Sequence, residues 1–89
     1  MAYTLNIDPA AQEQIRALPP KALVALAEAF EVLMLAPERG QPINPVNPTG
    51  GVYQLVYGND GRGLITYLLL ADQERVDVLL VTWVAFDDR

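Results

Sequence analysis

The part of this sequence that most constrains its fold is a pair of segments that are apolar at nearly every position. Residues 64–71 read LITYLLLA, and residues 75–86 read RVDVLLVTWVAF. Both are rich in β-branched and aromatic residues, and the polar stretch DQE between them predicts two strands joined by a turn. Alternate side chains of a strand point to opposite faces of a sheet. Strands of this kind therefore present apolar side chains on both faces.

The remaining segments predict two helices and two further strands. Residues 3–7 alternate apolar and polar side chains, as in a half-buried strand. Asp8 before Pro9 is typical of a helix start, and the pair Pro19–Pro20 ends that helix. A second helix opens at Pro20 and continues to about residues 35–36, with apolar residues at helical spacing. Residues 52–57 predict a strand, and GNDGRG is the turn that joins it to residues 64–71.

This order, β-α-α-β-β-β, predicts an α+β fold: an antiparallel sheet meander with two helices packed on one face. Residues 37–51, PERGQPINPVNPTGG, contain four prolines and three glycines, so we expect a long loop there. At 89 residues, we expect the chain, residues 1–89, to form a single domain.

Composition excludes several kinds of site. The chain has no cysteine, so we predict no disulfide and no thiolate metal site, and no other metal-ligand spacing or cofactor motif is present. No apolar run approaches the roughly 20 residues of a membrane span, and no signal peptide is visible. We therefore expect a cytoplasmic protein without membrane association. Six basic residues face eleven acidic ones, giving a net charge of −5, which argues against non-specific nucleic-acid binding.

The predicted sheet is larger than the helices can cover. Strands lie about 4.8 Å apart and rise about 3.3 Å per residue, so four strands make a layer roughly 20 Å on each side. Two helices, each about 10 Å wide, cover one such face. With strict alternation, Val76, Val78 and Leu80 would lie on one face, and Leu79, Val81 and Trp83 on the other. We therefore predict that a second copy or another protein packs on the uncovered face, unless the 37–51 loop and the C-terminal tail fold over it.

The order of elements, together with particular residues, resembles the RelE/ParE superfamily of toxins from bacterial type II toxin–antitoxin systems. The resembling segments are YTLNIDPAAQEQIRALP at the start, the single long helix, and GVYQLVYG, GRGLITYLLL and RVDVLLV at the end. The resemblance implies a cognate antitoxin as partner. It also implies ribosome-bound mRNA or DNA gyrase as a target, depending on the branch of the superfamily.

The mRNA-cleaving members of that superfamily use basic and aromatic residues, including an R-x-x-Y pattern on a hairpin strand. By resemblance, Tyr67 matches the tyrosine, whereas Leu64 stands where the arginine is usual. Arg62 lies two positions earlier and is the substitute candidate. The last strand lacks the usual His, Tyr or Lys near its end. The resemblance therefore favours a toxin-like protein that acts through protein binding over an RNA endonuclease, with a non-toxic homodimeric binding module as the alternative.

Six further residues are candidates for partner contact. An aromatic side chain on a sheet with few lysines nearby is more often part of a core or a protein interface than a base-stacking platform. Arg39, beside a glycine, and Arg62, between two glycines, are candidates for contact with a phosphate or carboxylate, or are simply solvated turn residues. The predicted partner-binding residues are Arg39, Tyr53, Tyr57, Leu79, Val81 and Trp83.

Overall fold

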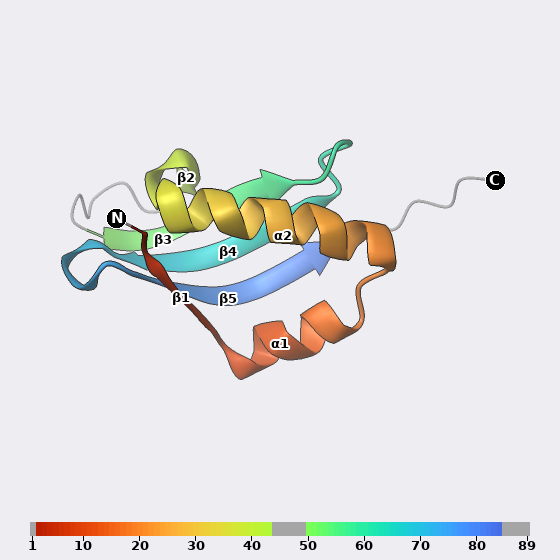
Figure 1. The fold of residues 1–89 in the computed structure, drawn as a ribbon, viewed down its shortest axis with the longest axis horizontal. Coiled ribbons are helices and arrows are strands. Elements are labelled where there is room, and N and C mark those ends of the chain that lie inside the picture. Colours follow the sequence, from red (N-terminus) through yellow and green to blue (C-terminus); the bar gives the residue numbers. More distant parts are fainter. Residues whose placement is uncertain (1, 44–49, 85–89) are drawn as a thin grey trace.

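Two helices pack on one face of a five-stranded sheet (Figure 1), in a computed structural model that describes residues 2–43 and 50–84. The elements are β1 (Thr4–Ile7), α1 (Pro9–Arg16), α2 (Pro20–Leu35), a 3₁₀ turn η1 (Pro37–Arg39), β2 (Gln41–Pro42), β3 (Gly50–Tyr57), β4 (Gly63–Leu70), a second 3₁₀ turn η2 (Ala71–Gln73) and β5 (Arg75–Trp83). The predicted α+β class and the placement of both helices on one face are confirmed.

The sheet is mixed rather than wholly antiparallel. Its strand order is β1-β5-β4-β3-β2, and the meander from β3 to β5 is antiparallel as predicted. However, β1 runs parallel to β5, with Leu5 opposite Val76. The chain can reach this position because α1 and α2 cross the sheet between β1 and β3. The segment predicted as a plain loop also contributes the short strand β2, which pairs with β3 at the opposite edge of the sheet.

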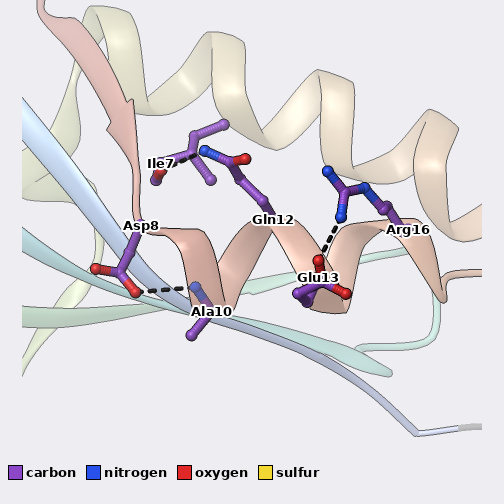
Figure 2. Close-up of polar contacts among 6 residues, drawn as sticks. All are labelled: Ile7, Asp8, Ala10, Gln12, Glu13 and Arg16. Atoms are coloured by element: carbon purple, nitrogen blue, oxygen red, sulfur yellow. Dashed lines mark hydrogen bonds and ion pairs between the residues drawn. The ribbon is translucent and has the colours of Figure 1, made fainter.

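The start of α1 follows the signals in the sequence (Figure 2). The Asp8 side chain accepts a hydrogen bond from the Ala10 backbone N–H at 3.0 Å, and Pro9 occupies the first helical position. The Gln12 side chain donates to the Ile7 carbonyl at 2.9 Å, which ties the helix back to the end of β1. The first of these contacts satisfies a backbone N–H that a helix start leaves without an intrahelical partner. Together they set the sharp change of direction between β1 and α1.

The hydrophobic core lies between α2 and the face of the sheet that α2 covers. On β4, buried and half-buried residues alternate without exception along the strand. Every second residue therefore points into the core, as the period of a strand requires. Short side chains on the inward face of α2 let the helix approach the sheet closely. The buried core residues are Ala11, Leu26, Ala29, Leu33, Tyr57, Ile65, Tyr67, Leu69, Val76, Val78 and Val81.

A β-bulge in β5 shifts the alternation of its side chains, so that residues in the second half of the strand point to the other face than strict alternation predicts. Thr66 of β4 is opposite Leu80, whereas the next residue, Tyr67, is opposite Val78. Leu79 is therefore the extra residue, and the alternation shifts by one position beyond it. The Gln14 side chain of α1 accepts a hydrogen bond from the Val81 backbone N–H at 2.7 Å, just past the bulge.

This bulge corrects the expected division of β5 into two faces. Val81 is buried on the same side as Val76 and Val78, and Trp83 packs against that core. Leu80, predicted to share a face with Val76, is exposed instead. Strict alternation fails here because one strand carries one more residue than its partner over the paired length.

Part of the predicted 37–51 loop is ordered into η1 and β2, and residues 44–49 lie outside the described residues, as do residues 85–89. The suggestion that this loop and the C-terminal tail cover the second face of the sheet falls partly on those segments. Within residues 2–43 and 50–84, no helix has both the length and the apolar character needed to cross a membrane.

Candidate partner-binding surface

The face of the sheet turned away from the two helices is here called the open face. Its members follow from the strand register, because side chains directly opposite one another on paired strands share a face. Three cross-strand rows of side chains make up its centre. These rows are Val56–Leu64–Thr82, Gln54–Thr66–Leu80 and Val52–Leu68–Asp77, followed by Leu70 opposite Arg75.

The open face is mixed in character: the leucines of β4 lie on either side of Thr66, and β5 contributes Leu80 beside polar side chains. Leu64, Leu68 and Leu70 of β4 are half-buried, because side chains of β3 and β5 flank them on both sides. Val56 is 61% exposed and Leu80 43% exposed, so the apolar area extends onto both neighbouring strands. Several contiguous large apolar side chains at a surface are typical of an interaction site.

The charged groups on the open face are already paired with each other. The Arg75 guanidinium donates to both carboxylate oxygens of Asp77, at 3.0 Å and 3.3 Å. Among the described residues of this face, Arg75 is the sole cation. A phosphate bound at the centre of the face would therefore meet leucine, valine and threonine side chains rather than lysine or arginine. The surface suits an apolar partner.

Tyr67, one of the two catalytic candidates, lies in the centre of the core. Its side chain is fully buried, and its hydroxyl donates a hydrogen bond to the Pro37 carbonyl. The Gly40 backbone N–H also hydrogen-bonds to this hydroxyl, while burial raises the pKa of Tyr67 to about 12. The phenol therefore stays protonated at neutral pH and has no access to a substrate. The structure gives it a structural role: it holds η1 and β2 against the sheet.

The close fit around Tyr67 also explains Gly40. A Cβ atom at position 40 would lie 2.2 Å from the Tyr67 hydroxyl oxygen and 2.8 Å from the Gln54 carbonyl oxygen. Both distances are far below a van der Waals contact, so only glycine lets the chain pass this point. The Tyr53 ring stacks on the Tyr67 ring, with centroids 5.7 Å apart.

Arg62, the other catalytic candidate, lies on the helix side of the sheet. It follows a turn in which Gly58 and Gly61 adopt positive φ angles of 93° and 68°, as the glycines of GNDGRG suggest. Its side chain is 13% exposed, and its Nε lies 3.6 Å from an Asp60 carboxylate oxygen. The same side chain lines a hollow of 460 Å³, together with residues of α2 and Trp83.

The structure does not bring the two catalytic candidates together. Tyr67 is four residues beyond the start of β4 at Gly63, which places it roughly 13 Å along the strand from the turn that holds Arg62. Each of the two side chains is enclosed by different elements. Their arrangement gives no shared site at which both could act on one phosphate.

The predicted partner-binding residues are divided between core and surface. Tyr57 and Val81, two of the predicted contacts, are 4% and 2% exposed and form part of the core rather than the surface. Tyr57 donates a hydrogen bond to the Thr82 carbonyl at 3.2 Å, and its ring packs against that of Trp83.

The other predicted contacts lie at different places. Tyr53, Leu79 and Trp83 are partly buried, and Arg39 is exposed at the end of η1. Arg39 lines a hollow of 280 Å³ at the edge of β3, beside Val56 and Leu64 of the open face. Of the six predicted residues, Arg39 is therefore the one beside the open face with an exposed side chain.

The sequence interpretation missed Val56 and Leu80 as members of the open face. Alternation along residues 52–57 places Val56 and Tyr57 on different faces of the sheet. The exposure of Val56 could therefore have been predicted from the strand period. Leu80 could not have been assigned in this way, because its orientation depends on the bulge at Leu79.

Comparison with known proteins finds similar solved structures, but no matching family model and no matching curated sequence. One similar solved structure is a chain of the RelBE2 toxin–antitoxin complex from Mycobacterium tuberculosis. It has 26% sequence identity and a TM-score of 0.78, and the match covers 94% of this chain and 100% of that one.

Two further structures extend the similarity. The isolated RelE toxin of E. coli is 20% identical, with a TM-score of 0.73 over 98% of this chain and 89% of the other. A chain of the archaeal RelE–RelB complex from Pyrococcus horikoshii is 14% identical, with a TM-score of 0.71 over 93% and 96% of the two chains. Matches that span nearly all of each chain concern the whole arrangement of helices and strands, as the resemblance in sequence pattern implied. The protein therefore has the fold of the RelE toxins.

Proposed function

We propose that this protein is the toxin-like component of a type II toxin–antitoxin pair and that it acts through protein binding. The observation that carries the proposal is the RelE-like fold over nearly the whole chain. Several of the similar structures are complexes of a toxin with its RelB antitoxin. By this analogy, the partner of the present chain is a small antitoxin encoded beside it.

The open face supports the proposal by its chemistry. Three of its leucines, Leu64, Leu68 and Leu70, lie on β4, the middle strand of the sheet, on the face turned away from α2. An amphipathic helix or an extended segment can bury such an apolar strip, and recognition of this kind is common in complexes of small domains. Removal of this area from water is the expected source of binding free energy, at about 25 cal/mol per Å² of apolar surface before the costs of association.

Protein binding is better supported than RNA cleavage by this chain. Cleavage through the RNA 2′-hydroxyl requires cations beside the phosphate and groups that transfer protons. Tyr67 is buried with a raised pKa, Arg62 lies on the helix side of the sheet, and Arg75 is paired with Asp77. We therefore propose that the protein acts by binding a partner through its open face and not through a set of catalytic residues.

The test is expression of the protein with and without the product of the adjacent reading frame. We expect growth arrest when the protein is expressed alone, relief by the neighbour, and recovery of the two proteins as one complex. Leu68→Gln, on the open face, should lower the affinity for the neighbour by roughly tenfold or more, because a buried amide without partners replaces apolar contact. Leu35→Gln is the matched control, since Leu35 is 73% exposed at the end of α2.

Three results would count against the proposal. Harmless expression of the folded protein, with no complex formed, would favour a non-toxic binding module of the same fold. Equal loss of affinity in Leu68→Gln and Leu35→Gln would show that the open face is not the binding surface. Cleaved transcripts after induction, abolished by Arg62→Ala, would instead establish the endonuclease activity that we do not favour.

A further inference from the structure

The outer surface of α2 is more apolar than that of an ordinary surface helix. A helix on the outside of a small domain normally presents charged and polar residues to water. The α2 sequence, PKALVALAEAFEVLML, has three charged residues in its 16 positions, and its inward face is filled by buried alanines and leucines. On the outward side, Val24 is 64% exposed and Leu23 41% exposed, and Ala27 is exposed beside them. In Figure 1 this side of α2 faces the viewer, with no described element over it.

The exposed residues form a regular seam along the helix. Pro20, Val24, Ala27 and Glu31 are all exposed and follow one another at intervals of four, three and four residues. This is the spacing at which a helix packs lengthwise against a second helix. The small side chain of Ala27, near the middle of the seam, allows a close approach.

The charges in and beside this seam are arranged with opposite signs at the two ends. Lys21 lies in the first turn of α2, while Glu28 and Glu31 lie in its second half, and all three are exposed. Two copies of the helix packed in parallel would bring the glutamates together. Packed antiparallel, the lysine of each copy lies near a glutamate of the other. The charge pattern is therefore self-complementary in the antiparallel arrangement alone.

We propose that a second copy of this chain docks on this seam, with α2 packed antiparallel against the partner's α2 about a two-fold axis. In this arrangement Val24 lies against the partner's Ala27, and Lys21 lies beside the partner's Glu31. The interface is isologous, so each of these contacts occurs twice. The open face is on the other side of the sheet and stays free for a different protein, so the inference stands apart from the proposed function.

The size of the seam sets the expected strength of the dimer. A helix of this length is about 24 Å long and about 10 Å wide. Such a strip buries less than the roughly 800 Å² per partner of a standard stable interface. The dimer is accordingly weak and dissociates on dilution.

Sedimentation velocity on the whole chain tests the proposal, over concentrations from about 1 µM to about 1 mM, the range of weak association. The wild-type protein should pass from monomer to dimer within this range. Lys21→Glu and Glu31→Lys should each weaken the dimer by roughly tenfold, because each replaces two attractive contacts with two repulsive ones. The double variant, with the charges exchanged, should return to near wild-type affinity. Circular dichroism checks that all variants are folded.

Cross-linking gives an independent readout, because the natural chain has no cysteine. Under mild oxidation, Ala27→Cys near the two-fold axis should form a covalent dimer far faster than Val56→Cys on the open face. Monomer at every concentration would overturn the proposal, as would a double variant no better than the single ones. A dimer that is lost in Leu68→Gln but kept in Val24→Glu would assign self-association to the open face and would also overturn it.

Discussion

The two faces of the sheet share their central strands β3, β4 and β5, yet they have different environments. On β4, Ile65, Tyr67 and Leu69 are covered by the helices, whereas the residues between them are partly exposed. The covered face carries aromatic rings and branched chains that fit one another, including a buried hydroxyl with a defined partner. The open face carries leucine and valine side chains interspersed with Gln54, two threonines and the paired Arg75 and Asp77. The covered face stabilises the chain, and the open face is available for binding.

This difference follows from how much of a sheet two helices can cover. The helices have the width to cover one side of a layer this size, as their dimensions indicate. Apolar residues exposed on the other side carry a cost in solubility, so their presence supports the proposed binding of a partner there. Substitutions on the two faces should therefore affect different measurements, with the following effects in decreasing order.

The largest effect is expected from Ile65→Ala on the covered face. Ile65 is fully buried between the helices and its neighbours on β3 and β5. Truncation should lower the free energy of unfolding by about 3 kcal/mol, because it removes buried methyl groups and leaves a cavity. Urea denaturation measures the change. A loss well under about 1 kcal/mol would mean that the helices do not seal this face.

The second effect is expected from Tyr67→Phe. At neutral pH the variant should lose about 1–3 kcal/mol, because the buried Pro37 carbonyl loses its donor. The pKa of Tyr67 is raised from 10.0 to about 12, so in the wild-type protein this contribution is complete below pH 10 and is lost as pH rises to about 12.

Unfolding measured at several pH values separates the loss of the hydrogen bond to Pro37 from the effect of the raised Tyr67 pKa. The difference in stability between wild type and Tyr67→Phe should narrow between about pH 10 and about pH 12. Over this range the phenol ionises in the unfolded wild-type chain but stays protonated in the folded one, which favours unfolding, and the variant has no phenol to ionise. A difference that stays constant across this range would show that the phenol is exposed to solvent.

The third effect concerns Leu64→Ala on the open face, beside Ile65 in the same strand. Its side chain is half-buried and packs against Val56 and Thr82, so the isolated chain should lose about 1 kcal/mol. Binding to the proposed antitoxin should fall by a larger factor, which calorimetry of the complex measures. If Leu64→Ala costs as much stability as Ile65→Ala, the two faces are equally covered and the comparison fails.

The smallest effect lies outside both faces, at the turn before β5. Glu74 has a positive φ of 51°, which is unfavourable for a residue with a side chain, and it is exposed. Glu74→Gly should therefore raise stability by about 0.5 kcal/mol, with no effect on partner binding. A rise in the thermal midpoint without a change in affinity is the expected result. Destabilisation would mean that the glutamate side chain holds the turn.

Most of the secondary structure could be predicted from local signals. Asp8 and Pro9 define the start of α1, the pair Pro19–Pro20 separates the helices, and the glycines of residues 58–63 form the turn before β4. These signals are reliable because each depends on the conformational limits of one or two residues. The strand period likewise identified the apolar character of both faces of β4.

The candidate site was predicted less well. Contacts between segments distant in sequence determine which of its residues lie in the core and which lie at the surface. Tyr67 was a catalytic candidate by resemblance, yet its hydroxyl donates a hydrogen bond to the carbonyl of Pro37, 30 positions earlier in the sequence. Tyr57 and Val81 belong to the core for a similar reason. No local pattern states whether an aromatic residue in a strand faces a helix or a partner.

The sequence by itself determined the order of the elements, the break between the helices and the surplus of apolar residues over what two helices can cover. These properties depend on residue type and spacing along the chain. The tertiary structure alone decided the parallel pairing of β1 with β5, the bulge at Leu79 and hence which residues of β5 face outward. Such features depend on how strands of unequal length fit together across the sheet, and a one-residue shift in that fit exchanges the two faces.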